Sequence, residues 1–160
     1  MRAMTAQELI ALNNISNTNS LFKAAHKVPG DKVDWKPLDS GRSVLDMCQE
    51  CALSPNWVMA LLASDKPFEM TPEIMQEYKL AKEALTTLEA CEKLAHENVA
   101  KLNELVSNFP DSKLGDTLAV SMWPGGQMPV TEALQLHNWN VSYHTGQINY
   151  IQTLYGDTGM

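Results

Sequence analysis

The 160-residue sequence contains no run of 18 apolar residues, so nothing in it predicts a membrane-spanning helix. Basic residues are also few: 12 Lys and Arg stand against 19 Asp and Glu, a formal net charge of −7. Nucleic-acid binding needs clustered basic side chains, and those present are scattered, so we expect no nucleic-acid partner and no membrane partner. The sequence also lacks a G-x-S-x-G motif, a phosphate-binding loop and a dinucleotide fingerprint.

Cysteine and β-branched residues are scarce as well. Three cysteines, an odd number, do not suggest the disulfide framework of a secreted protein, and residues 1–8 lack the apolar stretch of a signal peptide. We therefore expect a soluble, reduced, cytoplasmic protein. Leu (19) and Ala (15) far outnumber Ile (5) and Val (9), a composition typical of helical proteins. The length favours one domain over residues 1–160.

Four apolar stripes with helical spacing predict four helices. Their ranges are near 4–28, 43–64, 72–108 and 129–155. The first begins at a capping box that runs from Thr5 to Glu8. Its inward stripe is predicted to be Leu9, Leu12, Ile15, Phe22 and Ala25. Four helices in a chain of this length predict an all-α four-helix bundle.

Prolines and glycines mark the breaks between these helices. Pro55 lies inside the second stripe and predicts a kink there or a restart capped by Ser54. Thr71 and Pro72 predict the start of the third helix, and Gly156 predicts the end of the fourth. Between the third and fourth helices, residues 118–123 favour a short extended segment before a turn.

The last predicted helix carries three polar side chains on one face. His137, Asn140 and His144 are three and four residues apart, so they project from the same side as the apolar Ile148 and Ile151. Helix bundles build metal sites from such inward-facing ligands. A histidine on an apolar face is more often a hydrogen-bonded core residue, however, and His137 could equally lie at the helix surface near the loop.

The second predicted helix carries a carboxylate and two thiols. Glu50 lies close to the apolar side, where a buried carboxylate needs a cation or hydrogen bonds, whereas a half-exposed one on the helix flank does not. Cys48 and Cys51 have C-x-x-C spacing, but no second pair completes a structural zinc site. We expect them to be two thiols packed in the core.

The run His-Thr-Gly-Gln-Ile at 144–148 resembles the H-x-G-Q-I signature of the DinB/YfiT-like superfamily of four-helix bundles, many of them regarded as candidate metalloenzymes. Three further segments match the same template in order. They are the W-x-P at 35–37, the start of the second helix at 42–46 and the end of the fourth at 150–157. The resemblance covers nearly the whole chain and implies an up-down-down-up order of the helices.

The resemblance also implies a site. In the usual pattern one histidine from the second helix and two from the fourth bind a divalent metal; here those positions are Glu50, Asn140 and His144. Such a set would hold one divalent ion (zinc, nickel, iron or manganese) weakly, or would form a metal-free hydrogen-bonded cluster. The resemblance predicts that Glu50 lies within reach of His144, and that His137 and Trp139 line the entrance of the cavity.

Three hypotheses for function follow. Better-understood members resemble metal-dependent S-transferases for small thiols, in which the metal favours the thiolate; this implies a metal-dependent transferase or hydrolase acting on a small thiol or other small molecule. The alternatives are a metal-free small-molecule-binding protein and a structural, stress-associated bundle. Three histidines would favour the enzyme, whereas Glu50 and Asn140 favour metal-free binding. Members often form homodimers, and the small Gly146 would permit close approach of a neighbouring element.

Overall fold

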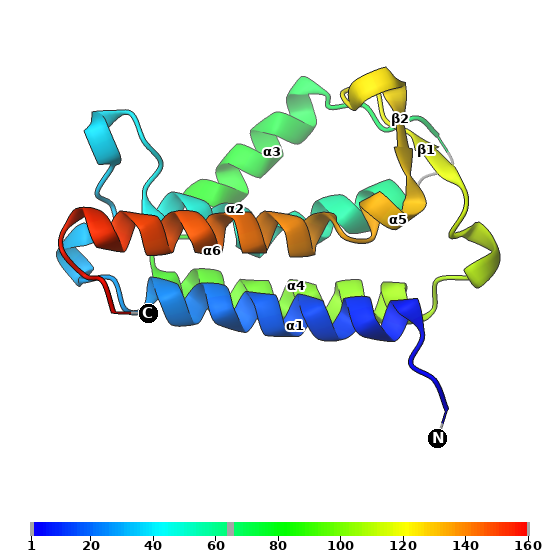
Figure 1. Ribbon diagram of the computed structural model, residues 1–160. Helices are drawn as coiled ribbons and strands as arrows, with labels where there is room; N and C mark the ends of the chain where they lie inside the picture. Colours follow the sequence, from blue (N-terminus) through cyan, green and yellow to red (C-terminus); the bar gives the residue numbers. More distant parts are fainter. Residues whose placement is uncertain (1, 64–65, 160) are drawn as a thin grey trace.

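The structure is a computed structural model that describes residues 2–63 and 66–159. Within them, four long helices lie side by side (Figure 1). They are α1 (Ala6–Ala25), α2 (Val44–Ala63), α4 (Leu88–Ser107) and α6 (Leu136–Leu154). α1 and α2 lie diagonally opposite each other, and each packs against both α4 and α6. α1 and α6 run one way and α2 and α4 the other, which confirms the up-down-down-up four-helix bundle.

The predicted capping box begins α1. The Thr5 hydroxyl accepts a hydrogen bond from the Glu8 amide at 3.1 Å, and the Glu8 carboxylate accepts one from the Thr5 amide at 2.8 Å. The C-terminal half of the helix packs into the core through Leu21, Phe22 and Ala25. The helix is shorter than the predicted 4–28 by two or three residues at each end.

The inward stripe predicted for the first half of α1 is wrong. Leu9, Leu12 and Ile15 are about half exposed. Polar side chains occupy the buried positions instead, and each finds a partner on another part of the chain. Gln7 donates to the Phe109 carbonyl at 3.0 Å, Asn14 to Asn103 at 2.8 Å, and Thr18 contacts His137 at 3.0 Å. Apolar periodicity could not reveal these long-range hydrogen bonds.

α2 passes through Pro55 without interruption, so the restart predicted at Ser54 does not occur. Proline has no N–H to donate to the carbonyl four residues earlier, which belongs to Cys51. The Ser54 hydroxyl lies 3.1 Å from that carbonyl oxygen and supplies the missing donor. This bond explains how the helix tolerates proline in its interior.

The single helix predicted over 72–108 is also wrong, because the chain turns at residues 84–87. α3 (Pro72–Glu83) begins as predicted at Thr71, and α4 begins at Thr87, whose hydroxyl accepts from the Ala90 amide at 3.2 Å. Leu85 within the turn and Leu88 at the start of α4 are both buried, so the apolar spacing continues although the helix does not. α3 rises away from the bundle over α2 (Figure 1).

The connection between α4 and α6 contains a small hairpin. β1 (Thr117–Ala119) pairs antiparallel with β2 (Gln127–Pro129). The extended segment predicted over 118–123 is present only as far as Val120, because residues 121–123 form a turn. A parallel bridge between Phe68 and Val120 joins the hairpin to the segment that precedes α3. Short 3₁₀ turns lie at Gly30–Lys32, Pro37–Asp39, Asp111–Lys113 and Pro124–Gly126.

The helix predicted over 129–155 consists of two helices, a single turn, α5 (Val130–Ala133), and then α6. The Gln135 amide bonds to the Glu132 carbonyl at 3.0 Å, and this tight turn separates them. α6 stops at Gly156, which has a φ of 94°, while the Asp157 amide bonds to the Gln152 carbonyl at 3.1 Å. None of the helices among the described residues has the length and apolarity needed to cross a membrane.

Candidate functional site: a cavity between α2, α3 and α6

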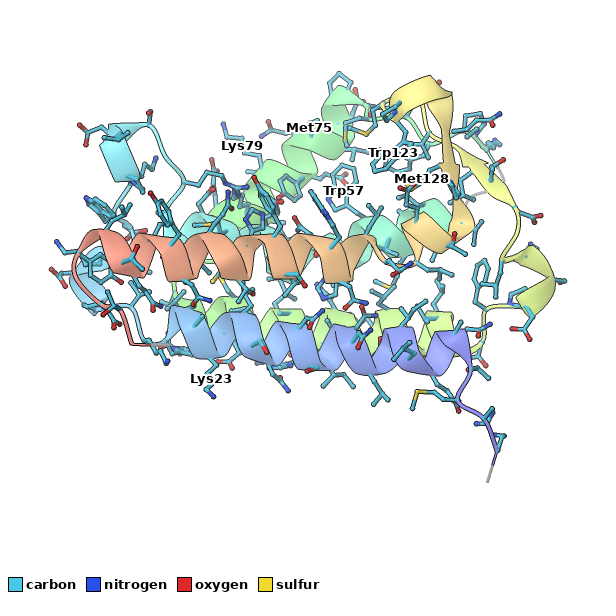
Figure 2. All side chains as sticks on the ribbon, viewed as in Figure 1. Lys23, Trp57, Met75, Lys79, Trp123 and Met128 are labelled. Carbon is cyan, nitrogen blue, oxygen red and sulfur yellow. The ribbon has the colours of Figure 1, made fainter. Side chains whose placement is uncertain are left out.

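A cavity of about 520 Å³ lies where α3 and the hairpin stand over α2 and α6. Figure 2 labels Trp57, Met75, Trp123 and Met128 around this space, on α2, α3 and the hairpin region. Most of its walls are aromatic rings and thioethers. These are Trp57, Phe68, Met70, Met75, Tyr78, Met122, Trp123, Met128 and Trp139.

The polar lining gathers where α2 faces α6. Glu50 and Ser54 come from successive turns of α2, and His137 and Asn140 from successive turns of α6. All four of these side chains therefore meet at one end of an otherwise apolar cavity.

Glu50 and His144 are in direct contact across the bundle. His144 Nε2 lies 3.1 Å from Glu50 Oε1, and His144 Nδ1 lies 2.7 Å from Gln147 Oε1. Because Nε2 faces a carboxylate, it donates the hydrogen bond in this contact. His144 is buried, at 2% exposure, whereas the Glu50 side chain keeps 30% of its surface exposed.

Arg42 holds the other oxygen of Glu50, a role that the sequence reasoning missed. Its Nη1 lies 2.7 Å from Glu50 Oε2, and its Nε donates to Asp46, which also pairs with Lys82. A chain of alternating charges therefore ends at the cavity. The signal was available in the sequence, since Arg42, Asp46 and Glu50 follow one another at four-residue spacing.

This cluster keeps Glu50 ionised. The hydrogen bond from His144 is the main cause that lowers the pKa of Glu50 to about 2, with Arg42 adding to it against the opposing effect of burial. Burial would raise the pKa of Asp46, but hydrogen bonds from Lys82 and Arg42 outweigh it and lower that pKa.

His137 lies at the floor of the cavity rather than at its entrance, and it is fully buried. Its Nδ1 lies 2.7 Å from Ser54 Oγ and its Nε2 lies 3.0 Å from Thr18 Oγ1. Because the Ser54 proton goes to the Cys51 carbonyl, Nδ1–H donates to Ser54 and Thr18 donates to Nε2. Burial lowers the pKa of His137 to about 4, so the ring is neutral at pH 7.

Asn140 and Trp139 occupy different places. Asn140 lines the cavity, and among the described residues its side chain has no hydrogen-bond partner. Trp139 also lines the cavity but is 64% exposed, and its ring stacks on Tyr143 with centroids 5.3 Å apart. Asn140 is therefore free to bond a ligand, and Trp139 forms part of the mouth.

The side chains of Glu50, Asn140 and His144, as the structure arranges them, do not fit a bound divalent metal ion. Within residues 2–63 and 66–159, no group of three His, Cys, Asp or Glu side chains is placed so that it could hold a metal ion. The Nε2 atom of His144 carries a proton towards Glu50, whereas a metal requires its lone pair. The Arg42 guanidinium also occupies Glu50 Oε2, so Glu50 could not bind a metal through both carboxylate oxygens. Metal uptake by Glu50, Asn140 and His144 would require both contacts to break.

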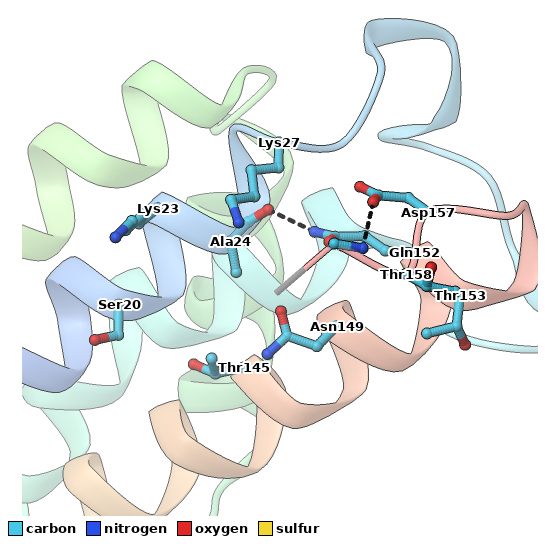
Figure 3. Close-up of a pocket in the computed structure, with 11 residues that line it drawn as sticks. Ser20, Lys23, Ala24, Lys27, Thr145, Asn149, Gln152, Thr153, Asp157 and Thr158 are labelled. Carbon is cyan, nitrogen blue, oxygen red and sulfur yellow. Dashed lines mark hydrogen bonds between the residues drawn. The ribbon is translucent and has the colours of Figure 1, made fainter.

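A second cavity, of about 230 Å³, lies between the end of α1 and the end of α6 (Figure 3). Gln152 crosses it and donates to the Ala24 carbonyl at 2.8 Å. Its charged side chains, Lys23, Lys27 and Asp157, are exposed or half-exposed, so it concentrates no buried reactive group.

The sequence matches no family model and no curated protein, but solved structures resemble the chain closely in three dimensions. YfiT from Bacillus subtilis, a probable metal-dependent hydrolase with an unusual four-helix bundle topology, superposes with a TM-score of 0.72 at 14% identity, over 98% of this chain and 92% of YfiT. The chain has the DinB/YfiT-like fold. This confirms the fold that the resemblance of residues 144–148 and the other matching segments implied.

Two further structures share this DinB/YfiT-like fold. A conserved protein from Enterococcus faecalis superposes with a TM-score of 0.70 at 14% identity, over 95% of this chain and 98% of that protein. A mycothiol-dependent maleylpyruvate isomerase superposes with a TM-score of 0.66 at 15% identity, over 90% of this chain and 61% of the isomerase. At such identities the likeness concerns the fold.

Proposed function

We propose that the protein binds a small, largely apolar molecule in the cavity between α2, α3 and α6, without a metal ion. The observation that carries this proposal is the combination of an aromatic, Met-rich cavity of about 520 Å³ with a polar end whose charges are already paired. Small-molecule sites in proteins have this size and this mainly apolar lining with a few convergent polar groups.

Arg42 is the reason for proposing a function without metal. YfiT is described as a probable metal-dependent hydrolase, and its fold is shared here. In this chain the guanidinium supplies positive charge to Glu50 directly, and the Glu50–Arg42 pair also receives the His144 N–H. The cluster is therefore stable without a bound cation.

The reactive groups around the cavity favour binding over catalysis. The Ser54 proton is engaged by a backbone carbonyl, so Ser54 and His137 are not arranged as a nucleophile and its base. The thiols of Cys48, Cys51 and Cys91 are buried, and burial raises the pKa of each, which suppresses the thiolate.

The neutral fluorescent probe N-phenyl-1-naphthylamine tests the proposal. We expect it to bind one-to-one with a rise in fluorescence, and Trp139→Ala, at the mouth, to weaken binding severalfold. Tyr150→Ala is the matched control, because Tyr150 lies on the same helix, is equally exposed at 65% and does not line the cavity. Absence of saturable binding, or equal losses in the two variants, would contradict the proposal.

Two further expectations belong with this function. We propose a cytoplasmic location, in which the buried thiols stay reduced. We also propose a homodimer through the outer face of α6 around Gly146, where a Cβ atom would meet nothing within 4 Å. Analytical ultracentrifugation that returns only the 17.8 kDa monomer at all concentrations would contradict the dimer.

A further inference from the structure

Glu50 is the one charged side chain among the described residues that line the cavity. The other titratable lining groups, His137 and Tyr78, are neutral at pH 7 because burial lowers the pKa of the first to about 4 and raises that of the second to about 12. The chain as a whole carries a formal charge of −7. An anionic ligand would therefore meet repulsion from Glu50. A monovalent cation in contact with the free lone pairs of Glu50 would lie nearer to the carboxylate than to the Arg42 guanidinium on Oε2, so the attraction would exceed the repulsion.

The Glu50 carboxylate still has room to accept hydrogen bonds. Its two oxygens offer about four lone-pair sites. His144 uses one site on Oε1 and Arg42 uses one on Oε2. Because the side chain is 30% exposed and lines the cavity, the remaining sites can receive donors from a ligand.

Three aromatic rings line the same cavity as this carboxylate. The Trp57 ring meets Phe68 at a centroid distance of 5.7 Å and Tyr78 at 5.9 Å, with interplanar angles of 60° and 73°. Rings inclined in this way present faces and edges to a shared space, the arrangement in which proteins hold organic cations by cation–π attraction. Burial raises the pKa of Tyr78, and the Glu50 charge adds to the rise, so the Tyr78 hydroxyl is within electrostatic reach of the carboxylate.

From this juxtaposition we infer that the ligand is a hydrophobic primary amine bound as its ammonium ion. The ammonium group donates to Glu50, and to Asn140 through the amide oxygen, while the apolar part packs against Trp57 and the methionine side chains. The inference rests on the proposed function, since it names the chemistry of the molecule that the cavity binds.

Three matched probes test it: 2-phenylethylamine, 2-phenylethanol and phenylacetate, each titrated at pH 7 by displacement of N-phenyl-1-naphthylamine and by calorimetry. We expect the amine to bind at least about tenfold tighter than the alcohol, the ratio that one charge-assisted hydrogen bond supplies, and the anion to bind most weakly. The preference for the amine should shrink with added salt, because screening weakens the charge interaction and leaves the alcohol unaffected.

Glu50→Gln keeps the shape of the side chain and removes its charge. We expect this variant to bind the amine and the alcohol within about threefold of each other, while Glu104→Gln, an exposed position on α4 outside the cavity, keeps the wild-type ratio. If Glu50→Gln does not fold, the ratio of amine to alcohol affinity in the wild-type protein, and the change of that ratio with salt, test the inference without the variant.

The outcomes separate the two proposals. Equal affinity for amine and alcohol, tighter binding of phenylacetate, or failure of all three to displace a bound probe would overturn the amine inference and leave the proposed function standing. Failure of the neutral probe itself to bind would overturn the proposed function and the inference with it.

Discussion

The guanidinium of Arg42 lies 2.7 Å from Glu50 Oε2, the carboxylate oxygen that His144 does not contact. The resemblance to the DinB/YfiT-like superfamily predicts a metal ligand at Glu50. In the structure the positive charge beside that carboxylate comes from the Arg42 side chain. The bond from His144 then joins α2 to α6. This arrangement leads to the proposal of a cavity that works without metal.

Replacing Arg42 should create metal affinity. In Arg42→Gln the guanidinium no longer occupies Glu50 Oε2, so a divalent cation can reach both carboxylate oxygens together with Asn140 and His144. We expect calorimetric titration with Zn²⁺ or Ni²⁺ to show affinity at least roughly tenfold higher than in the wild type. The control is Arg2→Gln, which removes an exposed ion pair with Glu8. Equal metal affinity in wild type and Arg42→Gln would show that the guanidinium does not block the site.

Removing the Ser54 hydroxyl should destabilise the fold. Ser54→Ala leaves the Cys51 carbonyl and His137 Nδ1 without partners in a buried region, a loss of about 1–3 kcal/mol in the free energy of unfolding. Urea unfolding measures it, with the exposed Ser20→Ala on α1 as control.

Pro55→Ala gives a second arm to the same experiment. Alanine restores a backbone N–H that can donate to the Cys51 carbonyl, so Ser54→Ala should cost less in a Pro55→Ala background than alone. Equal costs in the two backgrounds would show that Ser54 does not replace the donor that proline removes.

Buried His137 should make the protein less stable below neutral pH. The pKa of His137 is depressed to about 4 in the folded chain, whereas the unfolded chain takes up a proton near pH 6.5. The stabilising contribution is therefore complete above pH 6.5 and is lost as the pH falls towards 4, on the order of 2–3 kcal/mol. Unfolding of His137→Gln across this range should show a flatter pH dependence than the wild type; equal slopes would contradict the prediction.

The contribution of Glu50 to the stability of the fold should be lost at lower pH than that of His137. The pKa of Glu50 is lowered from 4.5 to about 2 in the folded state, so its contribution is complete above pH 4.5 and is lost as the pH falls towards 2. Because the side chain is partly exposed, we expect a loss on the order of 2 kcal/mol. Glu50→Gln should be less stable than wild type at pH 6, and the gap should narrow towards pH 2. A gap that stays constant with pH would count against the ion cluster.

Local signals in the sequence predicted the helix ends well. The capping box at Thr5, the cap at Thr71 and the stop at Gly156 depend on a few neighbouring residues, and all three are present. The break between α3 and α4 was missed because apolar spacing persisted through Leu85 and Leu88, although Thr87 carried a local cap signal. Periodicity alone cannot separate one helix from two that share a core.

The site could be predicted only in part for the same reason. The resemblance placed Glu50 opposite His144, and the two are in contact. Thr18 on α1 and His137 on α6 are 119 residues apart in the sequence, so no local pattern predicts their contact. Arg42 escaped attention because it lies before the first residue of α2, although its four-residue spacing to Asp46 is a local signal.

The most direct test of the account is a titration of the wild-type protein with N-phenyl-1-naphthylamine after dialysis against EDTA, repeated with Zn²⁺ or Ni²⁺ added in excess. Metal-free binding in the cavity predicts a saturable one-to-one fluorescence increase with the same dissociation constant in both conditions. Binding that disappears after chelation and returns with the metal would contradict the account and favour a metal-dependent site at Glu50, Asn140 and His144.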